Sequence, residues 1–492
     1  MPGLTKPVII LFCGFVTILQ IILWLPSYIY RCLVLQLVKI LRPDLGPILD
    51  PIATLIDENY SENKANCSII CVLKIGGDLT LQQARNIFST NVMQAKILTA
   101  KGNFVLRYPE LAQCQVRYMG YTFWKQEIGF QIKNHVWEEQ NLKAERISEI
   151  HEKMLNKTYT EEKSPWELII IRNYCEPDDK QKPESQTLLI LRIHHSMADG
   201  KSVVKLLVEG LGKKKLNAAT AVNTEDRSFW QQVQFNFCLP YSLIKINQLF
   251  LENQMITQKH PWSVKDIHND QSVINTALSK KISKNQIKLI AKRNKVRMSS
   301  VFLLIITDTI RKFHEEKGTP CHDSLPVYCL LPKENHPDVL KNHLYIGVPK
   351  LPVEEPCSKI RLQKCDDLYS NLRNSSLPQA TEVLACLVSS WVSGMRSRLT
   401  PVRAVSTVVS NVAGEEVGFN VGSHPCLDFT MTVGFRRSSI GVQFFVLSYK
   451  DSLQFSVSTK GSVMDGSATK KLADLIGKEC DRLVNADSVP SL

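Results

Sequence analysis

The chain opens with a run, residues 8–25, that contains no charged side chain. A helix of eighteen residues rises about 27 Å, which just covers the hydrocarbon core of a bilayer. Pro26 then interrupts the run, and residues 27–41 continue as a second apolar stretch whose only charges are Arg31 and Lys39. We therefore expect residues 8–25 to form a transmembrane helix and the second stretch to lie along the membrane.

The charges that flank the run indicate its orientation. Three cations follow it and one side-chain cation precedes it: Arg31, Lys39 and Arg42 against Lys6. The positive-inside rule therefore places the large C-terminal part in the cytosol. A cleaved signal peptide is disfavoured, because residues 25–28 (LPSY) form a poor cleavage site. The alternative is a hydrophobic hairpin that enters one leaflet and returns at the proline, which leaves the bulk of the chain on the same side.

The rest of the chain has the composition of a globular protein with a basic surface. Apolar residues make up 44% of the 492 residues, which is enough for a real core. Sixty Lys and Arg against 47 Asp and Glu give a net charge of +13, which favours anionic membranes, phosphorylated ligands or nucleic acid as partners. Nucleic acid is disfavoured, because no binding motif for it is present. The fourteen cysteines show no zinc spacing, so we expect no metal site and a reducing compartment.

Alternating apolar runs and helical patterns predict two mixed α/β halves. The strand candidates are residues 67–75, 166–173, 187–194, 402–412, 442–448 and 453–457, and the second and third of these form a hairpin. Helices are expected over residues 80–90, 203–211, 287–313 and 468–483.

These elements divide the chain into four parts. They are a membrane anchor with a juxtamembrane segment (1–43), a first lobe (44–211), a crossover linker (212–270) and a second lobe (271–492). For the aromatic part of the crossover, residues 229–251, packing on the body of the protein is favoured over a second membrane contact.

The motif that carries chemistry is residues 194–200 (HHSMADG), between an apolar strand and an apolar-faced helix. Its H-H-x-x-x-D-G pattern is much more specific than a lone glycine-rich loop. Asp199 can accept backbone N–H groups at the helix start, and Gly200 permits an unusual turn. Such a turn holds His195 at a strand end with one ring nitrogen in a cleft, as a general base requires. The alternative is a packed histidine pair with Asp199 as a simple helix cap.

At these residues the sequence resembles the wax ester synthase/diacylglycerol acyltransferase family, within the chloramphenicol acetyltransferase and condensation-domain superfamily. The resemblance covers about residues 67–483. It includes residues 130–136 (FQIKNHV) and 166–168 (WEL) upstream of the motif. Downstream it includes residues 410–414 (SNVAG), similar to the S-N-V-P-G segment of the family, and 448–453 (SYKDSL), similar to its late S-Y-x-G-x-L strand pair.

The resemblance implies an α/β fold in which two chloramphenicol-acetyltransferase-like lobes form a pseudodimer around a central tunnel, with the N-terminal transmembrane helix in addition. It implies a membrane-bound O-acyltransferase that uses acyl-CoA as co-substrate, with no permanently bound cofactor. The acceptor is a fatty alcohol, which gives a wax ester, or diacylglycerol, which gives triacylglycerol. The implied residues are His195 as general base, His194, Asp199 and Gly200 as its support, and Ser410 and Asn411 as substrate or oxyanion contacts. Acyl-CoA supply and lipid substrates favour the endoplasmic reticulum, with lipid droplets as a related destination.

The sequence also departs from the family pattern. Ala413 and Glu415 stand where the family has prolines, Ser164 begins a P-L-W-like segment, and residues 299–300 are Ser-Ser where the family usually has Asn-Asp. Two alternatives therefore stay open: a catalytically silent relative that binds lipid or organises a membrane complex, and an acyltransferase for another acceptor such as a sterol, retinoid or amine. Residues 280–312 hold ten Lys or Arg and one acid, a cluster suited to coenzyme A phosphates, an anionic bilayer or plain solvation.

Overall fold

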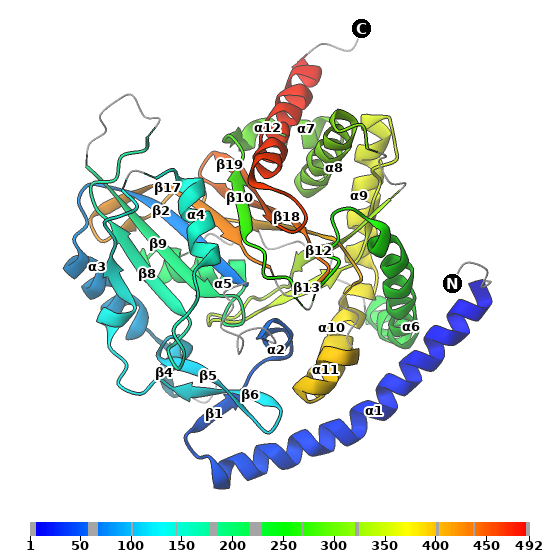
Figure 1. The fold of residues 1–492 in the computed structure, drawn as a ribbon, viewed down its shortest axis with the longest axis horizontal. Helices are drawn as coiled ribbons and strands as arrows, with labels where there is room; N and C mark the ends of the chain where they lie inside the picture. The colour runs from blue at the N-terminus through cyan, green and yellow to red at the C-terminus, as the bar shows by residue number, and fades with distance from the viewer. Residues whose placement is uncertain are drawn as a thin grey trace.

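Two β-sheets, built from the apolar strand runs, organise the molecule into two lobes, and helices pack around both (Figure 1). The structure is a computed structural model. It describes residues 6–57, 67–99, 102–143, 145–177, 185–215, 229–267, 269–319, 324–399, 403–435 and 438–488. The mixed α/β class expected from the sequence is confirmed.

The first lobe contains a six-stranded sheet in the order β16-β17-β2-β9-β8-β7. Its strands are β2 (Ser68–Gly76), β7 (Val136–Glu138), β8 (Trp166–Ile171), β9 (Gln186–His194), β16 (Asn420–Val421) and β17 (His424–Val433). Strands β8 and β9 form the predicted antiparallel hairpin, of whose connecting loop residues 178–184 lie outside the described part. Because β2 and β9 are buried on both faces, their sequences are continuous apolar runs.

Three helices belong to this lobe: α3 (Leu81–Phe88), α4 (Ile147–Asn156) and α5 (Gly200–Lys205). Thr80 caps α3 in a capping box with Gln83, which explains the start of the helix expected there. The helix predicted over residues 203–211 is the end of α5 followed by a π-helical segment to Leu211.

The second lobe contains an eight-stranded sheet whose main path is β10-β19-β18-β15-β12-β13. Its strands are β10 (Ile274–Leu278), β11 (Ile282–Ser283), β12 (Leu325–Pro332), β13 (Leu344–Gly347), β14 (Lys350–Leu351), β15 (Thr407–Ala413), β18 (Val442–Tyr449) and β19 (Ser452–Lys460). The stretch 287–313 is two helices, α7 (Lys284–Arg293) and α8 (Met298–Glu316). Helix α8 packs between α9 (Ser358–Asn374) and the closing helix α12 (Gly466–Ser488).

Strand β17 interlocks the two lobes. It comes from the second half of the sequence, yet it pairs antiparallel with β2 of the first sheet, with Phe429 opposite Leu73. The apolar pattern does not predict this strand, because its first half is mostly polar or exposed. Residues 271–492 therefore supply strands to both sheets, and the seam between the sheets is a place where distant residues meet.

Smaller elements connect the lobes. A three-stranded sheet has the order β1-β6-β5, and β3 pairs only with β4. These elements are β1 (Leu45–Ile48), α2 (Pro51–Asp57), β3 (Lys96–Leu98), β4 (Phe104–Leu106), β5 (Gln113–Tyr118), β6 (Tyr121–Gln126), α6 (Phe229–Lys259), α10 (Leu377–Ser389) and α11 (Ser393–Leu399). Residues 216–228 of the predicted crossover lie outside the described part, and most of the remainder is α6.

The N-terminal helix α1 runs without a break from Lys6 to Leu41, so the two pieces expected on either side of Pro26 are one helix. A proline inside a helix removes one hydrogen bond and bends the helix without necessarily ending it. Contacts beyond Pro26 hold the second half in place: the ring centroids of Tyr30 and Tyr121 lie 6.2 Å apart, and Val34 is fully buried. Among the described residues, α1 is the one helix long and apolar enough to span a membrane.

Candidate active site

The H-H-x-x-x-D-G motif lies where strand β9 ends and helix α5 begins, as expected from the sequence. The backbone N–H of His195 donates to the carbonyl oxygen of Cys67 at 2.8 Å, which extends the pairing of β9 with β2 by one residue. Asp199 is the N-cap of α5, and its carboxylate accepts the backbone N–H of Ser202 at 2.7 Å. Gly200 faces Val412 of β15, and a Cβ at Gly200 would lie 2.8 Å from a methyl group of that valine. The glycine is therefore needed for close approach of the two lobes.

Asp199 also holds a loop of the second lobe. The backbone N–H of His343 donates to Asp199 Oδ2 at 2.8 Å, and His336 Nε2 lies 3.2 Å from Asp199 Oδ1. The other ring nitrogen of His336 faces the carbonyl oxygen of Pro337 at 2.9 Å. Both nitrogens of His336 thus face oxygen atoms, and the ring links the Asp199 carboxylate to the loop that carries it. Burial raises the pKa of Asp199, but the hydrogen bond and charge of His336, together with the backbone N–H groups of Ser202 and His343, outweigh burial, and the net shift of this pKa is downward.

The same loop brings Asn342 to His195. Asn342 Nδ2 donates to the carbonyl oxygen of His195 at 2.8 Å, which fixes the orientation of the side-chain amide. Its Oδ1 therefore faces His195 Nδ1, at 3.1 Å, and accepts the proton of that nitrogen. This assigns the proton of the neutral ring to Nδ1 and leaves Nε2 as the basic nitrogen. The sequence does not predict Asn342, because it follows His195 by 147 positions and belongs to no periodic element.

His195 is partly exposed, whereas its neighbour His194 is buried. Burial among protein atoms lowers the pKa of His195, and backbone hydrogen bonds and the charge of Asp199 oppose this shift only in part. The ring therefore stays neutral near pH 7 and is able to accept a proton.

His194 has a different environment. Its Nδ1 lies 2.6 Å from the hydroxyl of Ser196, and that hydroxyl accepts a hydrogen bond from the Gln115 side chain at 2.7 Å. The Ser196 hydroxyl can therefore donate its proton to Nδ1 of the neutral His194 ring. Burial, with the charges of His195 and Arg192, lowers the pKa of His194 to about 3. This ring is buried in the protein interior.

The other residues singled out from the sequence lie at varying distances from the motif. Ser410 and Asn411 are on β15, two positions and one position before the Val412 that faces Gly200. Within the described residues, no hydrogen bond joins either of them to His195, so their role stays a prediction. Ser300 is buried at the start of α8 and donates to Asp366 of α9 at 2.7 Å. The position that replaces the Asn-Asp pair of the family thus ties two helices together within the second lobe.

Two segments that carry the resemblance meet in one structural cluster. His135 stacks on Phe130 and on Trp166, with ring centroids 5.0 and 4.8 Å apart. Its Nε2 lies 3.1 Å from Glu127, which also accepts the backbone N–H of Ser164. This cluster holds the edge of the sheet whose central strand β9 ends in the motif.

The basic cluster of residues 280–312 is largely paired with acids of neighbouring elements. Lys281 lies 2.8 Å from Asp428 of β17, and Lys284 lies 2.5 Å from Glu416. Arg297 pairs with Asp366. These pairs favour a structural use for much of the cluster and place its N-terminal end beside the seam.

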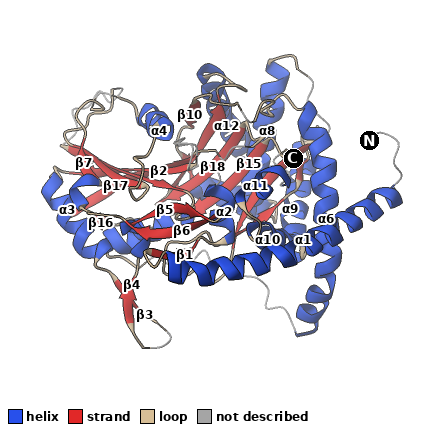
Figure 2. Ribbon diagram, turned by 60° about the horizontal axis from the view of Figure 1, so that its bottom comes forward, coloured by secondary structure: helices blue, strands red, loops and turns tan. Residues whose placement is uncertain are grey.

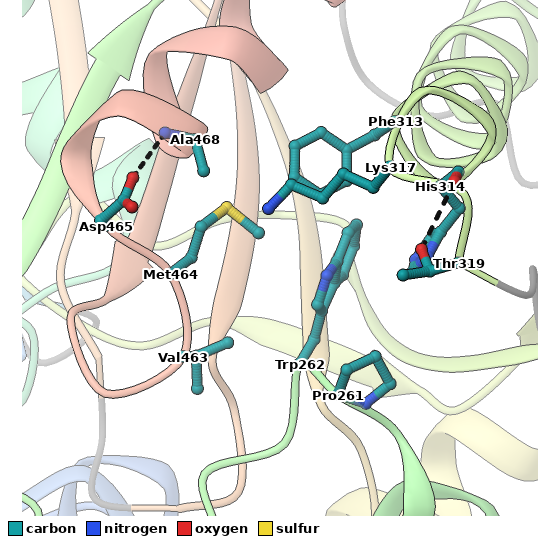
Figure 3. A pocket seen from close by; sticks show the side chains of 10 residues that line it. All are labelled: Pro261, Trp262, Phe313, His314, Lys317, Thr319, Val463, Met464, Asp465 and Ala468. Atoms are coloured by element: carbon teal, nitrogen blue, oxygen red, sulfur yellow. Dashed lines mark hydrogen bonds between the residues drawn. The ribbon is translucent and has the colours of Figure 1, made fainter.

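A pocket of about 250 Å³ lies elsewhere in the second lobe (Figure 3). Trp262, Phe313 and Met464 line it, with Lys317 and Asp465 at its rim. None of its lining residues belongs to the motif or to the loop of Asn342. Among the residues that the structure describes, no three His, Cys, Asp or Glu side chains converge as a metal site.

Two mixed α/β lobes with the motif at their seam form a fold shared with solved acyltransferases and condensation domains. Residues 342–483 match the family described as the WS/DGAT C-terminal domain, where WS/DGAT denotes wax ester synthase/diacylglycerol acyltransferase. This match supports the family expected from the motifs, over the C-terminal part of the chain.

Solved structures share the fold at low sequence identity. The wax ester synthase/diacylglycerol acyltransferase of Marinobacter aquaeolei VT8 is 12% identical, with a TM-score of 0.57 over 90% of this chain and 100% of that one. A trichothecene 15-O-acetyltransferase of Fusarium sporotrichioides is 8% identical, with a TM-score of 0.59 over 89% and 94%. The condensation domain of the Monacolin K polyketide synthase is 9% identical, with a TM-score of 0.55 over 91% and 98%. A comparison with curated proteins finds no match.

Proposed function

We propose that this protein is an acyl-CoA-dependent O-acyltransferase that transfers a long-chain fatty acyl group to a fatty alcohol, to diacylglycerol or to both. The observation that carries the proposal is the environment of His195. The ring is neutral, is oriented by Asn342 and stands at the end of a rigid strand at the seam of the lobes. The WS/DGAT C-terminal domain supports the choice of lipid substrates.

In the proposed reaction, Nε2 of His195 takes the proton of the acceptor hydroxyl as its oxygen attacks the thioester carbonyl. A tetrahedral oxyanion forms, the carbon–sulfur bond breaks, and the proton passes from His195 to the departing thiolate. No covalent bond to the protein is needed. General base catalysis of this kind contributes about 10²- to 10⁴-fold, and positioning and oxyanion stabilisation contribute the rest.

The other motif residues have supporting roles in this proposal. Asp199 and Gly200 set the turn and the distance between the lobes, and His194 packs behind the motif. Ser410 and Asn411 are the proposed contacts for the substrate or the oxyanion, because β15 brings them to the seam. A dry passage between the lobes would exclude water, so that hydrolysis does not compete with transfer.

The proposed location is the cytosolic face of the endoplasmic reticulum, with lipid droplets as a related destination. The apolar helix α1 supports membrane attachment, and acyl-CoA and both acceptor lipids are available at that surface.

The test is a lipid-product assay in which membranes containing the full chain receive long-chain acyl-CoA, fatty alcohol and diacylglycerol together. We expect labelled wax ester, triacylglycerol or both, and we expect His195→Ala to abolish them at unchanged expression. The matched control is His424→Ala, because the His424 ring lies 3.1 Å from the carbonyl oxygen of Gly76, at the end of β2 opposite to the motif. Full activity of His195→Ala would overturn the assignment of the base. Saturable lipid binding without any product would favour the silent relative instead.

A further inference from the structure

Helix α1 carries one continuous apolar stripe on the face that points away from the body. The stripe repeats every three or four residues along the whole helix, across Pro26, as one face of a helix does. Its members are Leu11, Phe15, Ile18, Ile22, Leu25, Ile29, Leu33, Leu37 and Ile40, all exposed. A helix of this length rises about 54 Å, well beyond the roughly 30 Å of a hydrocarbon core. The stripe is therefore longer than a perpendicular span requires.

The opposite face of α1 packs on the protein at two places, one in each half of the helix. Cys13, Thr17, Val34 and Val38 are buried there. In the middle of the uncharged run, Asn247 of α6 hydrogen-bonds Thr17 and Gln20 at 3.0 and 2.9 Å. The body thus covers this face at the very residues that a transmembrane span would surround with lipid.

A spanning orientation would also carry charged groups of α6 into the hydrocarbon. Lys245 and Glu252 lie on α6 on either side of Asn247, and Glu252 faces Lys350 at 3.5 Å. Charged side chains at the centre of a bilayer cost several kcal/mol each. An orientation with α1 in the plane of the membrane leaves these charges on the aqueous side.

The β3–β4 hairpin is a second exposed apolar element. All of β4 is exposed, and Leu98 and Phe104 are exposed by 62% and 70%. An isolated two-stranded hairpin is marginal in water, and this one buries neither face on the protein. The hairpin gains stability if it enters an apolar phase.

The first half of α6 contributes a third element, with Phe237 and Tyr241 exposed by 81% and 63%. Helix α1, the β3–β4 hairpin and the N-terminal end of α6 all lie on the lower side of the molecule in Figure 2. Residues 6–41 and 96–107 contain cations but no acid. Apolar side chains with cations and no acids are the composition of a surface for an anionic bilayer.

We propose that α1, the β3–β4 hairpin and the first half of α6 form one docking face, on which the protein lies with α1 in the plane of an anionic lipid bilayer. This deepens the proposed membrane location and replaces a transmembrane span with an interfacial helix. The face connects to the motif. Arg107, next to β4, donates to the carbonyl oxygen of Asp338 at 2.9 Å, and Lys341 lies 3.6 Å from Asp50. The first of these contacts ties the loop that carries Asn342 to the β3–β4 hairpin of the docking face, where lipid substrates would arrive.

The native cysteines provide a first test. Cys32 and Cys238 are exposed on α1 and α6, and Cys175 and Cys357 are exposed elsewhere. We would reconstitute the full chain on vesicles of phosphatidylcholine and phosphatidylserine and treat them with a membrane-impermeant maleimide. Peptide mass spectrometry should show loss of labelling at Cys32 and Cys238, its return in detergent, and full labelling at the two control cysteines. Equal labelling of all four cysteines would overturn the proposal.

A second test distinguishes the in-plane helix from a span. An epitope tag placed before Met1 should be digested by protease added outside sealed vesicles, on the same side as the body. Protection of the tag would establish a span and overturn the in-plane arrangement.

A third test uses matched variants at limiting lipid. Phe104→Glu with Leu106→Glu should lower the vesicle-bound fraction. Leu289→Glu, at an exposed apolar position of α7, should leave it unchanged. A hairpin variant that binds like the α7 control would exclude the hairpin from the face. None of these readouts measures acyl transfer. A negative result in them would overturn the docking face without affecting the proposed reaction, and a negative lipid-product assay would overturn the reaction without affecting the docking face.

Discussion

Replacing Asn342 with alanine removes the two hydrogen bonds that orient the imidazole of His195 and its backbone. These are the bonds from His195 Nδ1 to Asn342 Oδ1, at 3.1 Å, and from Asn342 Nδ2 to the His195 carbonyl oxygen, at 2.8 Å. A neutral hydrogen bond contributes about 1 kcal/mol net, so the pair contributes about 2 kcal/mol to holding the ring. If that orientation is used in the transition state, kcat should fall by about 30-fold, since each 1.36 kcal/mol is a factor of ten.

The assay compares kcat and KM for acyl-CoA in the wild type, Asn342→Ala and Asn342→Asp. The loss should appear in kcat, because Asn342 touches the ring and not the substrate. The aspartate variant gives a second readout that a merely structural residue would not move. A carboxylate beside Nδ1 favours the imidazolium and raises the pKa of His195, so more base is protonated at a given pH. The acid limb of the pH profile of kcat/KM should therefore move to higher pH.

Two results would refute this reasoning. One is a kcat of Asn342→Ala equal to that of the wild type. The other is an Asn342→Asp enzyme that is active but has an unchanged acid limb. Thermal unfolding of both variants should accompany the kinetics, so that a fall in folded protein is not taken for a fall in kcat.

Three predictions concern stability. Gly200→Ala should destabilise by about 1–3 kcal/mol, because the added Cβ lies 2.8 Å from Val412, and Val412→Ala in the same chain should restore the melting temperature. Burial raises the pKa of Glu110 to about 7 from 4.5. Above that pH, ionisation of the buried Glu110 carboxyl lowers the folding stability by up to roughly 3 kcal/mol. Glu110→Gln should therefore raise the melting temperature at pH 8 and leave it unchanged at pH 4. Burial lowers the pKa values of His151 and His194 to about 3, so folding stability should fall as pH drops below 6.5, by about 1.4 kcal/mol per pH unit for each histidine. His151→Gln should reduce that slope by about 1.4 kcal/mol per pH unit in melting curves, and an unchanged slope would contradict it.

The local sequence pattern was enough to predict the strand, turn and helix that carry the H-H-x-x-x-D-G motif. Strand β9, the turn at Asp199 and the start of α5 are neighbours in sequence, and their propensities and capping act over a few residues. The same is true of the β8–β9 hairpin and of α12. Strand β17 was not predicted, because its partner β2 is hundreds of residues away in the sequence and because buried and exposed residues do not alternate regularly along β17.

The sequence by itself determined which segments are apolar, where the motif turns and which histidine stands at the strand end. Only the tertiary structure decided that Asn342 and His336 reach the motif, since both lie on a loop without periodicity that is brought there by the pairing of the two lobes. Hydropathy likewise made α1 a candidate membrane helix. Whether that helix crosses the bilayer or lies on it depends on which of its faces the body covers, and a count of apolar residues contains no information on that.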